Sequence, residues 1–226
     1  MSGTLFLVAT PIGNRGDLSP RAREVLASVD LVCAEDTRVA GKLLAMLQVK
    51  KRLLRYDHHS HDRQLPHIVA ALQEGLRVAY VSDAGTPGVE DPGGRLVAGI
   101  RAQCPEAKIV PIPGPSAVMT ALSVSGFPAE YVHIFGFPPK KKGRQAYFDR
   151  MAGEEETVAF YESTHRIMDT LHALSERIPT RACIVARELT KLHETILRGT
   201  VSEVESALAS GSQRGEFVVV LGPVRY

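Results

Sequence analysis

The sequence has few cysteines, no long apolar run and little net charge. Its three cysteines, Cys33, Cys104 and Cys183, lie far apart and form no CxxC pair, so neither a disulfide framework nor a cysteine-built zinc site is supported. No apolar run approaches the ~20 residues that cross a bilayer, and residues 1–14 lack the basic and apolar regions of a secretion signal. We therefore expect a cytoplasmic protein without a membrane partner. The formal net charge of +2 is too small to indicate a polyanionic partner by itself.

Two common nucleotide-binding motifs are also absent. No GxGxxG follows the first apolar run and no GxxxxGK[ST] occurs, so neither a dinucleotide fingerprint nor a phosphate-binding P-loop is expected. The composition itself is ordinary, because 44% of the 226 residues are hydrophobic and 23% are charged. Such values are typical of globular proteins and argue against the disordered and fibrous classes. A chain of this length can form one large α/β domain or two small ones.

Apolar runs rich in Val and Ile alternate with helical patterns in the first half of the chain. We expect strands at 4–9, 31–35, 52–56, 77–82 and 108–113. We expect helices within 18–29, 37–47, 60–74 and 92–103. Ser19 is the predicted cap of the first helix, and Pro20 follows it where a missing N–H costs nothing. Repeated strand-helix units of this kind predict a mainly parallel sheet.

The second half of the chain has a less regular pattern. Strands are expected at 132–137, 157–162, 182–188, 193–201 and 216–221. A loop and helix are expected within 113–126, and further helices at 163–178, with Ser163 as its cap, and at 202–210. We therefore predict an α/β protein of two domains, an N-terminal domain at residues 1–115 with a mainly parallel sheet and a C-terminal domain at residues 116–226 with a mixed sheet.

Four irregular loops follow predicted strands of the first half. ATPIGNRGD follows the first strand, EDTR the second, SDAGTPGVEDPGG the fourth and PGPSA the fifth. Ligands of open α/β sheets lie just beyond the carboxyl ends of the strands, where glycine lets the backbone approach a ligand and proline fixes the loop shape. Glycine and proline also mark ordinary turns, so one such loop would mean little. Four at equivalent strand ends indicate a ligand site.

An ordered set of motifs resembles one enzyme family. The motifs are VATPIGNRGDLSPRA, AEDTR, VSDAGTPGVEDPG, VPIPGPSAVMTAL, FYESTHR, and ARELTK followed by HET. Together they resemble the ribosomal RNA small subunit methyltransferase I family of the tetrapyrrole methylase superfamily. The resemblance implies a two-domain class III methyltransferase that acts as a homodimer, with S-adenosyl-L-methionine in a cleft between the domains. It implies methylation of a ribose 2′-hydroxyl on a cytidine in the decoding centre of 16S rRNA, within the small ribosomal subunit.

The resemblance also implies a set of cofactor-binding residues. The loop at 82–94 stands where relatives present a Gly-Asp-Pro type loop to the cofactor, and the first and fifth loops accompany it. Two residues of the second domain would complete the site. The predicted contacts are Pro11, Asp83, Gly85, Thr86, Val89, Ser116, Ala117, Tyr161 and Leu189.

A ribose hydroxyl is a weak acid, so methyl transfer to it needs a proton acceptor or a cation that favours the alkoxide. Glu162 or Glu188 is our preferred base and Lys191 an electrostatic helper, because they follow two strands that we expect to be neighbours. The wider group of candidates adds Arg38, Glu35, Asp36, Asp83, His165 and Arg187. The alternative for any single member is a structural ion pair that braces two loops.

Two clusters invite a nucleic-acid or metal interpretation. The segment KKKGR holds Lys140, Lys141, Lys142 and Arg144 in a predicted loop, which suits contacts to RNA phosphates; the alternative is a solvated charged loop. DHHSHD at 57–62 matches no standard zinc spacing, and we expect no metal. A helix-start loop in contact with RNA is the preferred interpretation of that segment.

Two other functions compare less well with the sequence than rRNA methylation does. A small-molecule methylase acting on a tetrapyrrole would need apolar walls more than the basic rim that KKKGR provides. A ribosome-binding module without catalysis would not need intact motifs at every strand end. Family members commonly continue beyond the strand at 216–221 with a further helical segment, whereas the sequence given ends at GPVRY. We expect the two domains and the cofactor site to form without that segment. We do not expect the RNA contacts that the segment would supply.

Overall fold

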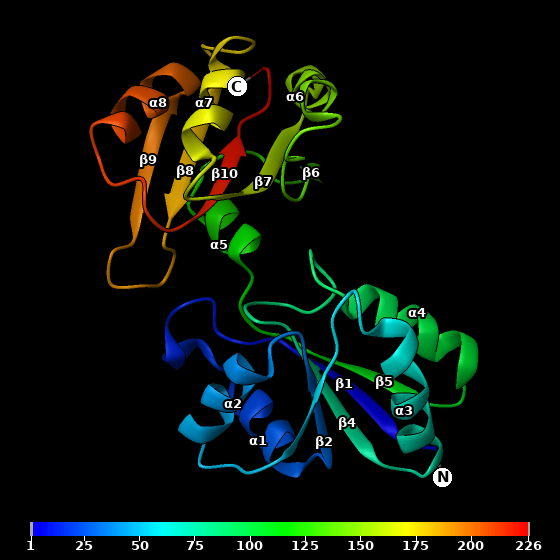
Figure 1. Ribbon diagram of the computed structural model, residues 1–226. Helices are drawn as coiled ribbons and strands as arrows, with labels where there is room; N and C mark the ends of the chain where they lie inside the picture. The colour runs from blue at the N-terminus through cyan, green and yellow to red at the C-terminus, as the bar shows by residue number, and fades with distance from the viewer. Residues whose placement is uncertain (1, 226) are drawn as a thin grey trace. The chain divides into compact units, whose positions relative to one another are not determined.

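A computed structural model describes residues 2–225. The chain divides into two compact units, unit 1 (Met1–Ser116) and unit 2 (Ala117–Tyr226), and each is built around a five-stranded sheet (Figure 1). Within residues 2–225, no helix is both long enough and apolar enough to cross a membrane.

Unit 1 is a parallel sheet covered by helices. Its strands lie in the order β3-β2-β4-β1-β5, and every neighbouring pair is parallel. This confirms the predicted parallel sheet. The elements are β1 (Thr4–Val8), the 3-10 turn η1 (Arg15–Asp17), α1 (Pro20–Ser28), β2 (Leu31–Ala34), α2 (Thr37–Met46), β3 (Arg52–Arg55), α3 (His61–Gln73), β4 (Arg77–Val81), α4 (Gly93–Gln103) and β5 (Lys108–Ile112).

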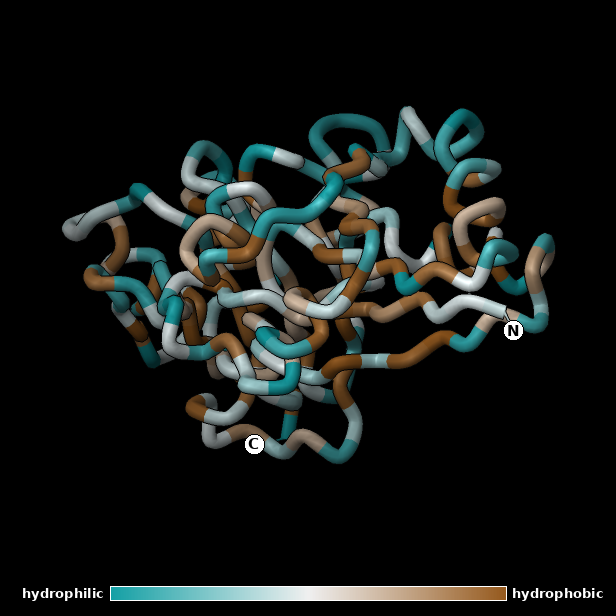
Figure 2. The backbone as a smooth tube through the Cα atoms, turned by 90° about the horizontal axis from the view of Figure 1, so that it is seen from below, coloured by the Kyte–Doolittle hydropathy of each residue, from teal (hydrophilic) through white to brown (hydrophobic). Residues whose placement is uncertain are grey.

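The two faces of this sheet are covered by different helices. Val78 and Tyr80 of β4 pack in one buried cluster with residues of α3 and α4. Ala79 and Val81 pack in a second cluster with residues of α1 and α2. Successive strand residues point to opposite faces, so a strand buried on both sides must be apolar throughout, as the run VAYV is. Brown apolar stretches alternate with teal hydrophilic ones along the chain in Figure 2.

Unit 2 is a mixed sheet with β10 at its centre. The strand order is β6-β7-β10-β8-β9; β6 and β7 are parallel, and all other neighbouring pairs are antiparallel. The predicted mixed sheet is therefore confirmed. The elements are α5 (Ala117–Ser123), β6 (Val132–Ile134), α6 (Arg144–Gly153), β7 (Thr157–Ser163), α7 (Ile167–Ser175), β8 (Ala182–Arg187), β9 (Thr195–Thr200), α8 (Val201–Ala209) and β10 (Glu216–Leu221).

Three helices bury their apolar sides in one core of unit 2. Phe148 of α6, Leu171 of α7 and Val204 of α8 pack in a single cluster with Phe160 and Val219 of the sheet. All five side chains are buried almost completely. Burial of this kind contributes roughly 1.5–3 kcal/mol for each large apolar side chain, so the core holds α6 firmly although the helix was not predicted.

Three sequence-based expectations for unit 2 are wrong. The strand expected at 132–137 ends at Ile134, and α6 begins at Arg144, inside the segment expected to be a loop. Ser163 does not cap α7, because it is the last residue of β7 and the helix begins only at Ile167, after Arg166. The backbone N–H of Arg166 donates to the Ser163 carbonyl (3.1 Å), so a turn separates strand from helix.

Candidate cofactor and active site

The carboxyl edge of the unit 1 sheet contains a topological switch point. β1 and β4 are adjacent central strands. The chain after β1 continues to α1, which packs on one face, whereas the chain after β4 continues to α4, which packs on the other. The two loops therefore diverge, and a divergence of this kind is where open α/β sheets bind their ligands.

Hydrogen bonds join the four predicted loops at this edge. Thr10 and Gly85 exchange backbone hydrogen bonds in both directions, at 3.0 and 3.1 Å. The Thr86 hydroxyl donates to the Pro115 carbonyl (3.0 Å), and the Asp36 N–H donates to an Asp83 carboxylate oxygen (3.1 Å). The structure thus brings together loops that are up to about a hundred residues apart in the sequence, as the motifs predicted.

Glycines in the loop at 82–94 fill places where a side chain would not fit. Gly85 is buried, has φ +83°, and a Cβ there would lie 3.3 Å from Cγ2 of Ile12. A Cβ on Gly93 would lie 2.8 Å from both Gly88 N and Cε1 of Tyr80. The loop is therefore compact, with its backbone close against neighbouring loops.

A carboxylate anchors the second half of this loop. Asp91 accepts hydrogen bonds from Gly88 N at 2.8 Å and from Gly93 N at 2.6 Å. The buried Tyr80 hydroxyl donates to the same carboxylate (3.2 Å). Asp91 was not among the predicted site residues, although the motif GVEDPGG contains it.

Three carboxylates give this edge a negative character. Burial, together with the charges of Asp83 and Asp91, raises the pKa of Glu35. Burial also raises the pKa of Asp83, aided by the charges of Asp36 and Asp91 and opposed by the hydrogen bond from Asp36 N. Acids held close together in partial burial are stabilised by a cation in their midst. The edge is therefore suited to a positively charged ligand.

Arg38 lies beside this cluster but is largely exposed. Its guanidinium pairs with Asp36, with the closest approach at 2.5 Å, and its side chain is 86% exposed. Asp36 also caps α2 by accepting from Arg38 N (2.8 Å). Hydrogen bonds from Arg38 hold the pKa of Asp36 far below its ordinary value. Asp36 is therefore fixed in a capping role, and Arg38 is held at the helix start.

The edge of the unit 2 sheet where β7 and β8 end differs from the sequence-based prediction. β7 and β8 point the same way, but β10 lies between them, so the expectation that these two strands are neighbours is wrong. The start of β10, at Glu216, separates Ser163 from Arg187. This insertion brings a third acidic residue, Glu216, into the group that follows β7 and β8.

A charged network occupies this edge. Lys191 Nζ lies 2.9 Å from Oε1 of Glu188 and 2.8 Å from Oε2 of Glu216. The same Glu188 oxygen accepts from Glu216 N (2.9 Å), and Glu188 N donates to the Glu216 carbonyl (2.9 Å). Glu188 adopts φ +53°, a left-handed conformation that is costly for a side chain with a Cβ. These contacts hold it there.

The network fixes the charges of its members. Burial raises the pKa of Glu188, but hydrogen bonds from Lys191 and Glu216 N and nearby cations outweigh burial, so this pKa lies below its ordinary value. Burial lowers the pKa of Lys191, but its hydrogen bonds to Glu216 and Glu188 outweigh that effect and raise the pKa. At neutral pH the network therefore contains a carboxylate and an ammonium group.

Glu162 does not belong to this network. Its side chain is fully buried and accepts hydrogen bonds from Ser163 N (2.7 Å) and from the hydroxyl of Thr170 (2.7 Å). Arg166 completes the arrangement at 3.0 Å. A carboxylate so enclosed is arranged to fix the turn between β7 and α7, which favours the structural ion pair over a base.

The remaining candidates have varied surroundings. Tyr161 stacks on Phe137 with ring centroids 5.3 Å apart, and Leu189 is only 6% exposed. Val89 is 42% exposed. Pro11, Ser116 and Ala117 are half-buried.

The two remaining charged candidates differ in their surroundings. His165 is exposed, whereas Arg187 donates to the carbonyls of Arg214 and His193, binding two neighbouring loops together.

The basic segment is divided between a loop and a helix. Lys140, Lys141 and Lys142 are exposed in the loop before α6. Arg144 instead begins the helix, donates to the Thr170 hydroxyl (2.8 Å) and lies over the ring of Phe148. The prediction of a four-cation loop is corrected here, because the arginine is used within the unit.

The histidine-rich segment at 57–62 contributes to the start of α3. Asp57 accepts from the backbone N–H of His59 and Ser60, and the buried His61 bonds to the hydroxyl of Tyr56. Within residues 2–225, no three His, Cys, Asp or Glu side chains are grouped so that they could hold a metal ion.

Similarity to known proteins agrees with this geometry. Residues 4–205 match the family of Tetrapyrrole (Corrin/Porphyrin) Methylases. A ribosomal RNA small subunit methyltransferase I of Xylella fastidiosa is 44% identical over 223 residues, which cover 97% of this chain and 81% of that protein. A protein of the same name from Escherichia coli O157:H7 is 42% identical over 225 residues, covering 97% and 77%.

Solved structures share the fold at low sequence identity. Diphthine synthase has a TM-score of 0.73 and 10% identity, covering 97% of this chain and 90% of that one. A uroporphyrin-III C-methyltransferase from Thermus thermophilus, complexed with S-adenosyl homocysteine, has a TM-score of 0.65 and 17% identity, covering 97% of each chain. The predicted two-sheet α/β methyltransferase fold is thus confirmed, and the chain belongs to the ribosomal RNA small subunit methyltransferase I family of the tetrapyrrole methylases.

Proposed function

We propose that this protein transfers a methyl group from S-adenosyl-L-methionine to the ribose 2′-hydroxyl of a cytidine in the decoding centre of 16S rRNA. The observation that carries the proposal is 44% identity, over nearly the whole chain, to a protein named ribosomal RNA small subunit methyltransferase I. The choice of cytidine and of its 2′-hydroxyl rests on the family motifs in the sequence. We further propose that the protein acts in the cytoplasm, as a homodimer, on rRNA within the small ribosomal subunit.

The carboxyl edge of the unit 1 sheet fits the proposed cofactor. S-adenosyl-L-methionine carries positive charge on its sulfonium and its amino group, and supplies an electrophilic methyl group when bound. Glu35, Asp83 and Asp91 provide the opposite charge. A Cβ on Gly85 would lie 3.3 Å from Cγ2 of Ile12, so the glycine lets this loop pack closely against the loop after β1.

We propose that the loops of this edge hold the cofactor through a mixture of backbone, carboxylate and apolar groups. Thr86 is fixed by its hydrogen bond to the Pro115 carbonyl, and Val89 offers an exposed apolar surface. We also propose Tyr161 and Leu189 of unit 2 as cofactor contacts. The full set of proposed contacts is Pro11, Asp83, Gly85, Thr86, Val89, Ser116, Ala117, Tyr161 and Leu189.

For the proton of the ribose hydroxyl we propose the pair Glu188 and Lys191. The ionised carboxylate of Glu188 can accept a proton, while the ammonium of Lys191 can stabilise a developing alkoxide. The two groups are already 2.9 Å apart, so little reorganisation is needed. Glu162 acts in this proposal as a positioning residue for the turn after β7, and Arg38 as a cation at the edge of unit 1.

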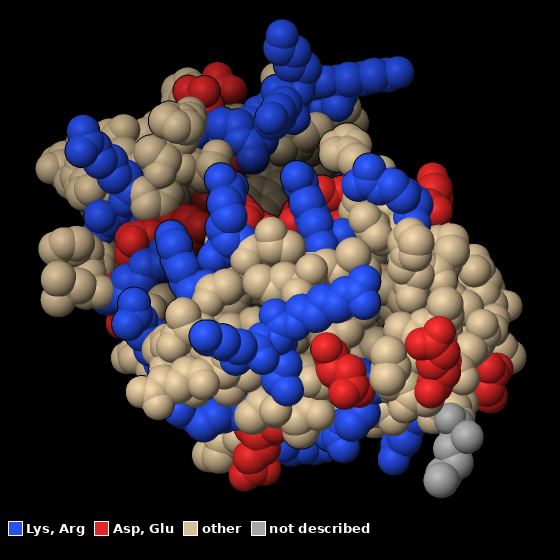
Figure 3. Space-filling view, turned by 60° about the horizontal axis from the view of Figure 1, so that its bottom comes forward, with Lys and Arg blue, Asp and Glu red and all other residues tan. Residues whose placement is uncertain are grey.

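Exposed cations support RNA as the substrate. Lys140, Lys141 and Lys142 are free of the intramolecular role that Arg144 has, and lysines of this kind contact phosphates without reading sequence. Figure 3 shows Lys and Arg side chains spread widely over the face that it presents, so the cationic surface is not confined to one loop.

The test is methyl transfer from labelled S-adenosyl-L-methionine to small ribosomal subunits that lack the modification, followed by mass spectrometry of the nucleosides. We expect 2′-O-methylcytidine to appear, and to be lost with Asp83→Asn or Glu188→Gln. Label in a base instead of a ribose, or in no nucleoside although the cofactor binds, would overturn the proposal. The wild-type protein assayed on subunits that already carry the modification is the control.

A further inference from the structure

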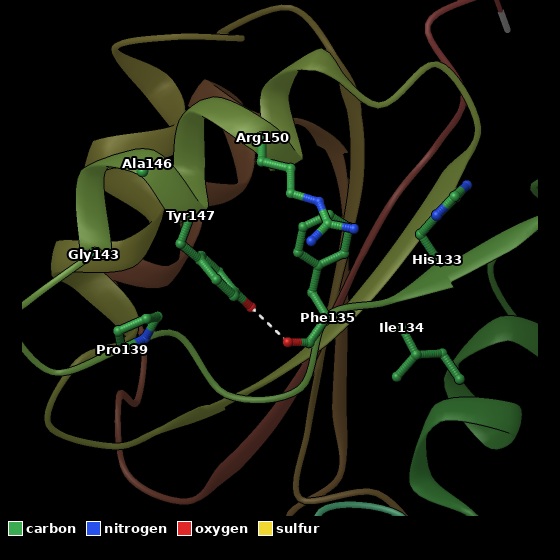
Figure 4. A pocket seen from close by; sticks show the side chains of 8 residues that line it. All are labelled: His133, Ile134, Phe135, Pro139, Gly143, Ala146, Tyr147 and Arg150. Carbon is green, nitrogen blue, oxygen red and sulfur yellow. Dashed lines mark hydrogen bonds between the residues drawn. The ribbon is translucent and has the colours of Figure 1, made fainter.

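An open groove lies on unit 2 next to the basic loop. Its volume is about 480 Å³, within the range of small-ligand sites. Figure 4 shows that its walls come from β6, from the following segment and from α6. The lining residues are His133, Ile134, Phe135, Pro139, Gly143, Ala146, Tyr147 and Arg150.

The wall of the groove contains two aromatic rings in edge-to-face contact and a guanidinium group. The rings of Phe135 and Tyr147 meet edge to face, with centroids 5.5 Å apart and planes at 89°. The Tyr147 hydroxyl donates to the Phe135 carbonyl (3.2 Å). The guanidinium of Arg150 lies over the Phe135 ring, 5.1 Å from its centroid, yet the Arg150 side chain is 74% exposed. One face of the guanidinium is covered, and the side chain is otherwise accessible.

Cations form the rim of the groove. Pro139 and Gly143 both line it, so the three exposed lysines between them stand at its border. Glu154 is the acidic group nearest to the lining cations, 3.6 Å from His133 and 3.8 Å from Arg150. Its side chain is only 22% exposed. The accessible charge around the groove is therefore positive.

We propose that this groove binds one unpaired nucleotide of the RNA substrate, with its base stacked on Arg150 and its phosphate near Lys140–Lys142. Stacking on aromatic rings and on guanidinium planes is how proteins hold unstacked bases, and a basic border follows the phosphates. An uncharged apolar ligand would not use the lysines. This inference rests on the proposed action on RNA and adds a second contact region to it.

The experiment measures binding of a short fluorescent single-stranded oligoribonucleotide to the full chain by anisotropy, with and without one abasic position. Arg150→Lys keeps the charge but removes the planar group. We expect it to weaken binding of the intact oligonucleotide roughly 10-fold and to leave the salt dependence unchanged. The abasic oligonucleotide should bind the wild type and Arg150→Lys equally.

A matched pair of variants tests the groove itself. Ala146 lines the groove, whereas Ala207 lies on α8; both are exposed helical positions of unit 2. Ala146→Glu should weaken binding at least as much as Arg150→Lys, and Ala207→Glu should have a small effect. Lys140→Ala, Lys141→Ala and Lys142→Ala combined should flatten the salt dependence instead. Thermal unfolding of each variant checks that it is folded.

Several outcomes would overturn the inference. Equal effects of Ala146→Glu and Ala207→Glu would mean that the added charge acts over a distance, and unchanged binding by Arg150→Lys would exclude stacking. If Ala146→Glu alters self-association and not RNA affinity, the groove is an interface between copies. Failure of the proposed function has a different signature: the groove variants behave as expected with the oligonucleotide, but no methylcytidine forms on ribosomal subunits.

Discussion

The carboxyl edge of the unit 1 sheet and the edge of the unit 2 sheet where β7 and β8 end both hold charged groups, but these groups are fixed in different ways. At the unit 1 edge, backbone groups and short side chains tie the loops together, as in the paired hydrogen bonds of Thr10 and Gly85. At the unit 2 edge, long charged side chains do so, with Lys191 between Glu188 and Glu216. Glu35 and Asp83 at the unit 1 edge have raised pKa values, whereas Glu188 at the unit 2 edge has a lowered one.

This difference separates two tasks. Acids whose pKa values remain raised, such as Glu35 and Asp83, gain most when a positively charged ligand arrives. Acids already paired with a lysine have their charge fixed in advance, which suits a group that must act without reorganising. The first edge is therefore suited to binding and the second to chemistry, and each can be disturbed separately.

The largest effect on stability is expected at Glu162, which is buried and fixes the turn between β7 and α7. Glu162→Gln replaces a fully buried carboxylate that is 3.0 Å from Arg166 by a neutral amide and leaves the arginine without its counter-charge. Breaking a buried pair in this way costs about 3 kcal/mol. Urea denaturation at pH 7 measures it. Glu156→Gln, at an exposed position, is the control and should change the free energy of unfolding little.

The next largest effect is on catalysis. Glu188→Gln should lower the rate of methyl transfer about 100-fold, as expected for loss of a positioned proton acceptor, while cofactor affinity stays near that of the wild type. Single-turnover assays and equilibrium binding of S-adenosyl-L-methionine separate the two quantities. A full rate with normal cofactor affinity would remove Glu188 from the chemistry and leave it as a brace for β10.

A smaller change at the first edge should affect binding more than chemistry. Gly85→Ala places a Cβ at φ +83° and 3.3 Å from Ile12, which costs roughly 1–2 kcal/mol of stability. Cofactor affinity should fall as the loop shifts. Calorimetric titration and thermal unfolding measure the two effects. Gly153→Ala is a matched control, because its Cβ meets nothing within 4 Å; equal behaviour of the two variants would mean that the loop tolerates a side chain.

The smallest effects are those of pH, and they should have opposite signs at the two edges. A lowered pKa means that Glu188 contributes stability above its unfolded value near 4.3, and that this contribution is lost as the pH falls through the folded pKa. A raised pKa means that Glu35 ionises less readily in the folded protein than in the unfolded chain. The free energy of unfolding therefore decreases as the pH rises from the unfolded pKa through the folded pKa of Glu35.

Unfolding free energies at pH 7 and pH 3 test these signs. Glu35→Gln should be neutral or stabilising at pH 7, with its benefit lost at pH 3. Glu188→Gln should be destabilising at pH 7, by an amount that shrinks at pH 3. The same sign for both variants would contradict the difference between the edges.

Local patterns predicted the fold better than they predicted the second edge. Ser19 caps α1, with Ala22 N donating to its hydroxyl (3.1 Å), because a cap depends only on residues nearby in the chain. The helix α6 was missed because exposed polar residues dominate it and only Phe148 and Met151 are buried. Its stability comes from the core of unit 2, which lies elsewhere in the sequence.

The site residues likewise divide into those that local sequence patterns predict and those that depend on tertiary packing. The loops of unit 1 carry glycines and prolines whose spacing is visible in the sequence, so their meeting at one edge was predictable from parallel strands. Glu216 was not predictable, because it reaches Lys191 only through the insertion of β10 between β7 and β8. The enclosure of Glu162 by Thr170 and Arg166 likewise depends on tertiary packing.

The central position of β10 also has a consequence for synthesis of the chain. The sheet of unit 1 has all its strands once Ile112 has been made, so this unit can fold while the rest of the protein is still being translated. The sheet of unit 2 cannot be completed so early, because its middle strand, Glu216–Leu221, is the last of its five strands to be made. Until then β7 and β8 expose unpaired edges, and the nascent C-terminal half depends on rapid completion, or on a chaperone, to avoid aggregation.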